Sequence, residues 1–207
     1  ALLEAMQEHQ VTASGVRHPL EEPFFVLATQ NPIEMEGTYP LPEAQLDRFL
    51  LRLRLGYPSI SDEIRVLEDQ QIQHPLESLK PIVKLKEILQ AVDDVKHIYI
   101  SPAVKRYVVE LTTRTRQSED VYLGASPRGS LSLARAGQAR AAMLGRDYVL
   151  PDDIQALAVA VLAHRIIVSP AARLRDLSSD RIVQEAIHAT SVPGGEFASE
   201  TAGKKAR

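Results

Sequence analysis

The sequence predicts an α/β segment followed by an all-α domain, and three observations point to this class. Residues 24–29, FFVLAT, form a short continuous apolar run, typical of a strand buried on both faces in a parallel sheet. Residues 51–55 alternate leucine with arginine, which indicates a strand with one solvated face near a sheet edge. From about residue 61 the apolar spacing is helical. We therefore place the boundary near residue 57.

The segment before this boundary holds further local signals. An apolar stripe at the start of the chain predicts a helix that ends near His9. Residues 10–20 alternate around a Ser-Gly pair, which predicts a projecting β-hairpin. Pro42 is tolerated at a first helical position, and a short helix is expected from it through Phe49.

The rest of the chain is predicted to be helical. The expected helices span residues 61–73, 84–94, 102–117, 127–144, 151–164 and 180–189. Proline begins three of them, and Ser101 and Ser126 are the expected N-caps of two. The predicted division is 1–57 for the α/β part, 58–192 for the helical domain and 193–207 for a disordered tail rich in Gly, Ser, Glu and Lys.

Composition narrows the functional classes. The formal net charge of −3 gives no basic footprint for nucleic acid, so no nucleic-acid partner is expected. The chain has no cysteine, which excludes disulfides and thiolate metal sites and favours a cytoplasmic location. No apolar run reaches the roughly 18 residues of a membrane span. The six histidines lack ligand spacing, and no metal site is predicted.

Asn31 is the first candidate site residue. It follows the carboxyl end of the predicted buried strand, where open α/β sheets bind ligands, and its amide could orient a water or contact a terminal phosphate. The alternative is that Asn31-Pro32 only turns the chain.

Arg48 and Arg128 are the candidate cations. Arg48 is either a surface ion pair with Glu43 or Asp47, or an arginine finger that supplies charge to a phosphoryl group. Arg128 is expected in the first turn of a helix, where the helix dipole disfavours positive charge. An anion bound there would remove the conflict, and pairing with a carboxylate such as Asp120 is the alternative.

One motif is misleading. Gly124 and Gly129 have the spacing of a phosphate-binding P-loop, but Ser130-Leu131 stands where Lys and Ser/Thr are required. Proline in the loop also removes a backbone N–H from the cradle. We reject a P-loop at this place.

Three stretches together resemble the MoxR family of AAA+ ATPases. They are ATQNPIEMEGTYPLPEAQLDRFLLRL, GASPRGSLSLARAGQARAAMLGRDYVLPDDI and VLAHRI, and the resemblance extends from Ala1 to about residue 192. It implies the C-terminal part of an AAA+ P-loop NTPase core, with parallel strands and a β-hairpin, followed by an AAA+ helical lid. The Walker A and Walker B motifs of the family are absent from the sequence, and we expect them upstream of a truncated chain.

The resemblance also implies residue roles. Asn31 matches sensor 1, which positions the attacking water and reads the γ-phosphate. Arg48 in LDRF matches the arginine finger, which acts on ATP in the adjacent subunit. Arg128 in GASPR matches sensor 2, which reaches the nucleotide of its own subunit. The hairpin at 10–20 matches a surface that could contact a client.

The implied function is ATP hydrolysis with Mg²⁺ in an oligomeric ring, expected to be a hexamer, that matures partner complexes in a chaperone-like way. A protein with a von Willebrand factor A domain, or an enzyme complex, is the implied partner. The chain of 207 residues alone is expected to be inactive. The alternatives are a non-catalytic interaction module derived from such an ATPase, and an ATPase subunit of the magnesium chelatase type.

Overall fold

The computed structural model describes residues 2–30, 42–71 and 74–193. In chain order, the elements are α1 (Leu2–Glu8), β1 (Gln10–Ala13), β2 (Val16–Pro19), α2 (Glu43–Leu46), α3 (Ile60–Asp69), the 3-10 turn η1 (Pro75–Ser78), α4 (Leu85–Lys96), α5 (Pro102–Gln117), β3 (Val121–Leu123), α6 (Pro127–Met143), α7 (Pro151–Leu162), the 3-10 turn η2 (Ala163–Arg165), β4 (Ile167–Val168), α8 (Pro170–Arg173) and α9 (Ser179–Ala189). Among the described helices, none combines the length and apolarity needed to cross a membrane.

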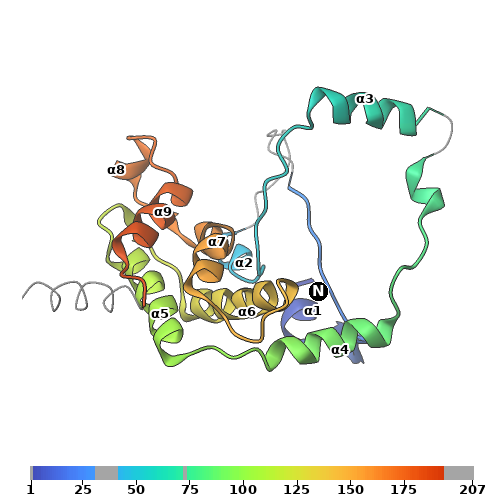
Figure 1. The fold of residues 1–207 in the computed structure, drawn as a ribbon, viewed down its shortest axis with the longest axis horizontal. Helices are drawn as coiled ribbons and strands as arrows, with labels where there is room; N and C mark the ends of the chain where they lie inside the picture. The colour runs from blue at the N-terminus through green and yellow to red at the C-terminus, as the bar shows by residue number, and fades with distance from the viewer. Residues whose placement is uncertain (1, 31–41, 72–73, 194–207) are drawn as a thin grey trace, which may run out of the picture.

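The core of the molecule lies in a helical bundle made by α5, α6, α7 and α9 (Figure 1). Its fully buried apolar side chains include Leu111, Leu133, Ile154, Leu162 and Val183. The expected caps hold in part. Ser101 accepts a hydrogen bond from the backbone N–H of Val104 at 3.2 Å, whereas Ser126 stands at the N-cap of α6 without capping through its side chain.

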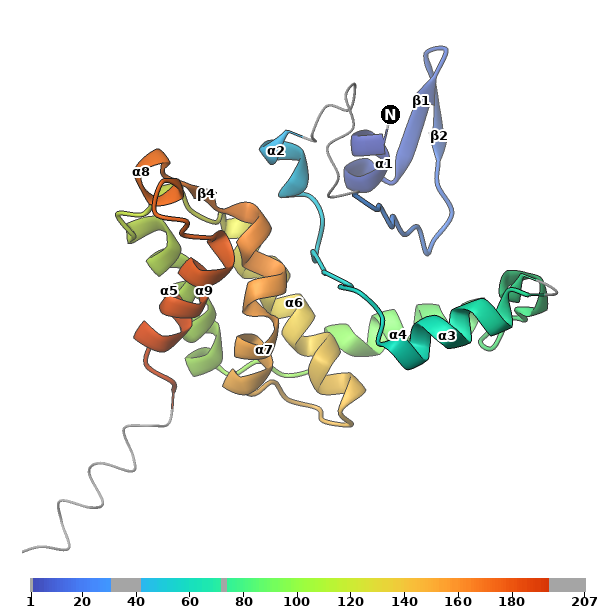
Figure 2. The ribbon, with the colours of Figure 1, turned by 90° about the horizontal axis from the view of Figure 1, so that it is seen from above.

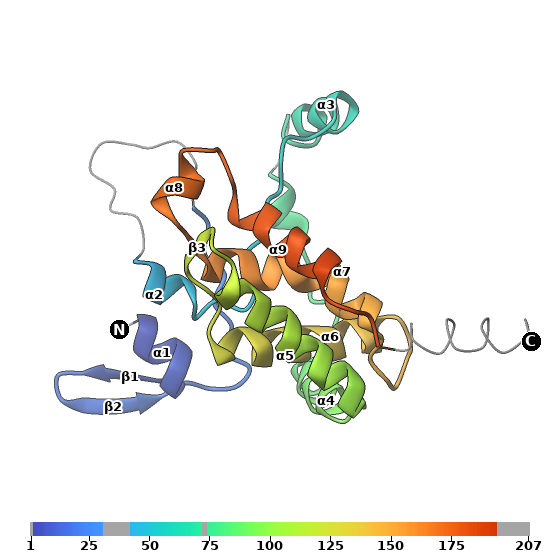
Figure 3. The ribbon, with the colours of Figure 1, turned by 90° about the vertical axis from the view of Figure 1, so that its left-hand side faces the viewer.

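The predicted hairpin is confirmed. β1 and β2 pair antiparallel from Gln10 opposite Pro19 to Ala13 opposite Val16. The turn residues Ser14 and Gly15 have φ values of 51° and 79°, the left-handed conformation that a tight hairpin requires. The hairpin and α1 stand outside the helical bundle (Figures 2 and 3).

The helices α3 and α4 extend away from the bundle, and α4 contacts it at α6 (Figure 1). Neither helix has a buried residue. The apolar positions Ile60, Ile64 and Leu67 of α3 recur at helical spacing, and all three are exposed.

Sequence patterns did not indicate the second small sheet. β3 and β4 pair antiparallel, with Val121 opposite Val168 and Leu123 opposite Ile167. Strands of three and two residues are too short to show alternation, so no periodic signal could predict them.

The predicted strand at 24–29 is not a strand in the structure. None of the described residues pairs with this run, and Phe25 and Leu27 are exposed while Phe24 and Val26 are half-buried. A strand needs a neighbour to satisfy its backbone groups. Because the described part of the chain supplies no such neighbour, the run stays extended and burial on both faces is wrong.

The predicted edge strand at 51–55 is also corrected. The segment forms no strand ladder with any described residue, although its arginine face is exposed, as expected. Arg52 and Arg54 lie 3.8 and 3.2 Å from the carboxylate of Asp180, in the first turn of α9. The leucines on the other face are exposed, with Leu55 97% accessible. The backbone N–H of Arg52 also donates to the carbonyl of Ala160 in α7 at 2.9 Å, so contacts with both α7 and α9 position this segment.

Gly124 is a close-approach position. An added Cβ would lie 2.6 Å from the Cα of Arg116 at the end of α5, and backbone cannot yield. At Gly137 the same atom would meet the flexible end of Ile154 at 2.7 Å. We expect Gly124→Ala to lower the free energy of unfolding by about 1–3 kcal/mol, and Gly137→Ala by less, in thermal or urea denaturation. Equal losses would contradict this account.

Candidate functional site

The candidate site is centred on Asp47, the residue that follows α2. Its carboxylate lies 3.1 Å from Nε of Arg165, which belongs to η2 at the end of α7. The side chain of Arg165 is 1% exposed and that of Asp47 is 26% exposed. Burial lowers the pKa of Arg165, and the charge of Asp47 opposes that shift. A charge so deeply buried requires a counter-charge, and Asp47 provides it.

Arg165 also binds the backbone that follows Asp47. Its NH2 donates to the carbonyls of Asp47 and Phe49, at 3.2 and 2.6 Å, and its NH1 donates to the carbonyl of Leu50 at 3.3 Å. Within the bundle it donates to Ser132 Oγ at 3.2 Å and to the carbonyl of Val161. One guanidinium thus joins residues 47–50 to α6 and α7.

His164 adds a second contact to the same segment. Its Nε2 lies 3.0 Å from the carbonyl of Phe49, and its Nδ1 is buried without a hydrogen-bond partner among the described residues. Burial lowers the pKa of His164 to about 4, the neighbouring charge of Arg165 adds to the shift, and the Phe49 carbonyl opposes it. The imidazole is therefore neutral at pH 7 and donates from Nε2.

Close packing at Gly129 lets α6 reach this junction. An added Cβ there would lie 3.1 Å from Leu162 and 3.5 Å from the Cδ of Arg165. Gly124 and Gly129, whose spacing imitates a P-loop, are thus explained by helix packing. The rejection of a phosphate cradle here agrees with this geometry.

Arg128 lies in the first turn of α6, as predicted, and faces Asp47. Its NH1 is 3.8 Å from Asp47 Oδ2, and the side chain is 43% exposed. The hydroxyl of Ser126 makes weak contacts with the same carboxylate at 3.4 and 3.5 Å. Arg128 thus pairs with a carboxylate, as the alternative expects, and this carboxylate is Asp47, whereas Asp120 pairs with Arg175.

Arg48 is half-buried between the two residues that Arg165 binds. Its backbone N–H donates to the carbonyl of Gln45 at 3.2 Å, which closes the turn after α2. The position of Arg48 is thus set by contacts of its neighbours Asp47 and Phe49 with η2. Its role as a finger, and that of Arg128 as sensor 2, remain predictions. Asn31 lies outside the described residues.

Sequence reasoning missed Asp47 and Arg165 as a pair. They are 118 residues apart, and each is a common surface type of residue. The only available signal was their position inside LDRF and VLAHRI, two of the stretches that carry the family resemblance.

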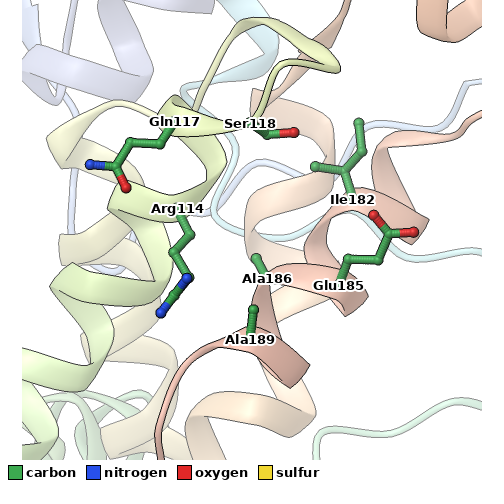
Figure 4. A pocket seen from close by; sticks show the side chains of 7 residues that line it. All are labelled: Arg114, Gln117, Ser118, Ile182, Glu185, Ala186 and Ala189. Atoms are coloured by element: carbon green, nitrogen blue, oxygen red, sulfur yellow. The ribbon is translucent and has the colours of Figure 1, made fainter.

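A surface groove lies away from this junction. It lies between α5 and α9, with Arg114 on one side, Glu185 on the other, and Ala186 and Ala189 between them (Figure 4). None of the predicted site residues lines it. Within the part of the chain that the structure describes, no group of His, Asp or Glu could hold a metal ion.

Comparison with known proteins identifies the family of the chain. Residues 1–51 match the family model described as "ATPase family associated with various cellular activities (AAA)", and residues 113–186 match that of the AAA lid domain. The chain is 36% identical to chaperone MoxR1 of Mycobacterium tuberculosis, over 93% of this chain and 53% of that protein. The chain belongs to the MoxR family of AAA+ ATPases.

The chain is also similar to two further proteins. The uncharacterized protein YeaC of Bacillus subtilis is 49% identical over 93% of this chain and 60% of its own length. The crystal structure of a putative ATPase from Cytophaga hutchinsonii superposes with a TM-score of 0.85 at 36% identity, covering 92% of this chain and 61% of that one. The chain therefore spans between half and two thirds of the length of these three relatives, and the fold is that of an AAA+ core segment with its lid.

Removal of Arg165 should be far more damaging than removal of an exposed arginine. We expect Arg165→Gln to lower the free energy of unfolding by about 3–5 kcal/mol, because it breaks a buried ion pair and orphans several carbonyls. Arg175→Gln is the matched control, since Arg175 also pairs with an aspartate but is 63% exposed. Its cost should stay under about 1 kcal/mol. Similar costs in urea denaturation would refute the special role of Arg165.

Stability should fall in acid through His164. In the folded state its pKa is about 4, below the ordinary 6.5, so the unfolded chain binds more protons between these values. The stability that neutral His164 contributes is therefore present above pH 6.5 and is lost as the pH falls to 4, by about 3 kcal/mol.

Denaturation curves at several pH values test this. His164→Gln retains an N–H donor for Phe49 but does not titrate, so the stability of this variant should depend less steeply on pH between 6.5 and 4. His188→Gln, at an exposed position of α9, is the control substitution. An unaltered slope in His164→Gln would exclude this histidine as the source.

Proposed function

We propose that the intact protein hydrolyses ATP in an oligomeric ring and uses the energy to remodel partner protein complexes. One observation carries the proposal: the half-exposed Arg128 lies in the first turn of α6 and faces the carboxylate of Asp47. A cation in the first turn of a helix is unfavourable unless an anion accompanies it, and a nucleotide phosphate is such an anion. Membership of the AAA+ ATPases supports ATP as the source of that phosphate.

The described donors fit a terminal phosphate. Arg128, Arg165 and the hydroxyl of Ser126 surround the carboxylate of Asp47, and phosphate oxygens present the same acceptor chemistry. When bound, ATP would supply a phosphoryl group for transfer to water. The accompanying Mg²⁺ has no candidate ligand cluster within the described residues.

The residues of this chain would contribute charge and position. Arg128 would bind the phosphate end of the nucleotide of its own subunit, and Arg48 would place a positive charge beside the phosphoryl group in the adjacent subunit. Asn31 would orient the attacking water. Such preorganised charge is the main source of catalysis in phosphoryl transfer. The hairpin, whose strand β2 is exposed along its length, is the proposed client contact.

The assembly and location belong to the same proposal. A hexameric ring is the assembly we propose, with a von Willebrand factor A domain protein or an enzyme complex as the partner, in the cytoplasm. The relative named chaperone MoxR1 supports a chaperone-like role.

Mixing two variants of the full-length protein tests the roles of both arginines. Arg48→Ala should lower kcat by about 10³-fold with ATP affinity nearly unchanged, because a finger acts in the transition state. Arg128→Ala should weaken ATP binding as well. Each pure variant should therefore be nearly inactive.

In a mixture, some sites have an intact Arg128 in their own subunit and an intact Arg48 from the neighbour. We expect partial recovery of hydrolysis there. Arg54→Ala, an exposed arginine that pairs with Asp180, should retain activity as the control. Recovery that never exceeds the sum of the pure variants would refute action between subunits.

A further inference from the structure

Asp47 occupies the position that the proposed function assigns to a phosphate. Its carboxylate is 3.8 Å from the guanidinium of Arg128, and it also receives the Ser126 hydroxyl in front of α6. The stretch that contains Arg128 and Ser126 lies about 80 residues further along the chain, so local sequence does not force this contact. The carboxylate is 26% exposed and is held from the other side by Arg165.

The two arginines that share Asp47 differ in freedom. Arg165 is 1% exposed and is fixed by several backbone carbonyls. Arg128 is 43% exposed, lies at the outer limit of an ion-pair distance, and has no other ion pair among those found for the described residues. Only Arg128 can therefore leave Asp47 at low cost, since exposed pairs contribute under about 1 kcal/mol.

We infer that Asp47 is a resident competitor of the nucleotide: it holds Arg128 while the site is empty, and a terminal phosphate must displace it to engage that arginine. This inference rests on the proposed function. Two consequences follow. Part of the affinity for ATP is offset by the lost Asp47–Arg128 contact. The residue released is the one directly before Arg48, so occupation of a subunit's own site changes the contacts beside the arginine that it presents to its neighbour.

The first test measures equilibrium binding of ATP and AMP to the full-length protein by calorimetry. Asp47→Asn removes the charge but retains an oxygen that can accept from Arg165. It should tighten ATP binding by about two- to fivefold, because the competing pair is worth under about 1 kcal/mol. AMP, which lacks the terminal phosphates, should bind as to the wild type.

The control is Asp120→Asn. Asp120 also pairs with an arginine, Arg175, and its side chain is 30% exposed, close to the 26% of Asp47. Its replacement should leave ATP affinity unchanged. In an Arg128→Ala background, Asp47→Asn should no longer tighten binding, since the arginine for which they compete is gone. Tightening that persists in that background, or no tightening in the wild-type background, would overturn the inference.

A second variant covers the case in which Asp47→Asn fails to fold, which thermal melting would reveal. Asp47→Glu keeps the counter-charge for Arg165 and extends the carboxylate towards Arg128. ATP binding should then weaken, and equal or tighter binding would overturn the inference. If the wild type itself does not bind ATP, the proposed function fails. If the wild type binds ATP but the Asp47 variants do not change the affinity in these directions, only the proposal that Asp47 competes with the nucleotide is wrong.

Discussion

The ion pair between Asp47 and Arg165 is the interaction on which the arrangement of this molecule depends. A guanidinium that is 1% exposed is costly unless a counter-charge and hydrogen-bond acceptors surround it. The chain provides them from residues 47–50, which must turn so that one carboxylate and three carbonyls face η2. The conformation of this short segment is thus fixed by the helical bundle.

This contact joins the two parts of the chain that match separate AAA models. The match to the ATPase model ends at residue 51 and that to the lid begins at residue 113, yet Asp47 and Arg165 bring these parts together. Arg48 and Arg128 lie on either side of the junction. Arg128 faces the carboxylate of Asp47, and Arg48 is the next residue in the chain. Any movement of the lid against residues 47–50 therefore changes the contacts around both arginines.

The sequence predictions were accurate where the interactions are local in sequence, and they failed where the partners are distant. The helices α3, α4, α5, α6, α7 and α9 and the hairpin were predicted because prolines, caps and turn residues act within a few positions, whereas the four-residue helix α8 was not predicted. The strands at 24–29 and 51–55 are absent from the structure, since a strand exists only through a partner, and neither run forms a strand ladder with any described residue. Arg128 was placed correctly in its helix turn, but its partner Asp47 could not be predicted because it lies far away in sequence.

The sequence by itself determined the helical domain, the hairpin, the family, and the candidates Asn31, Arg48 and Arg128. The local sequence patterns determine the helices and the hairpin, and the sequence motifs determine the family and the candidate residues. Only the tertiary structure decided that Arg165 is buried, that it fixes the segment around Arg48, and that Asp47 faces Arg128. The reason is physical. From sequence alone a charged residue is expected at the solvated surface, and it becomes a buried ion-pair partner only when the fold removes its water and leaves one counter-charge within reach.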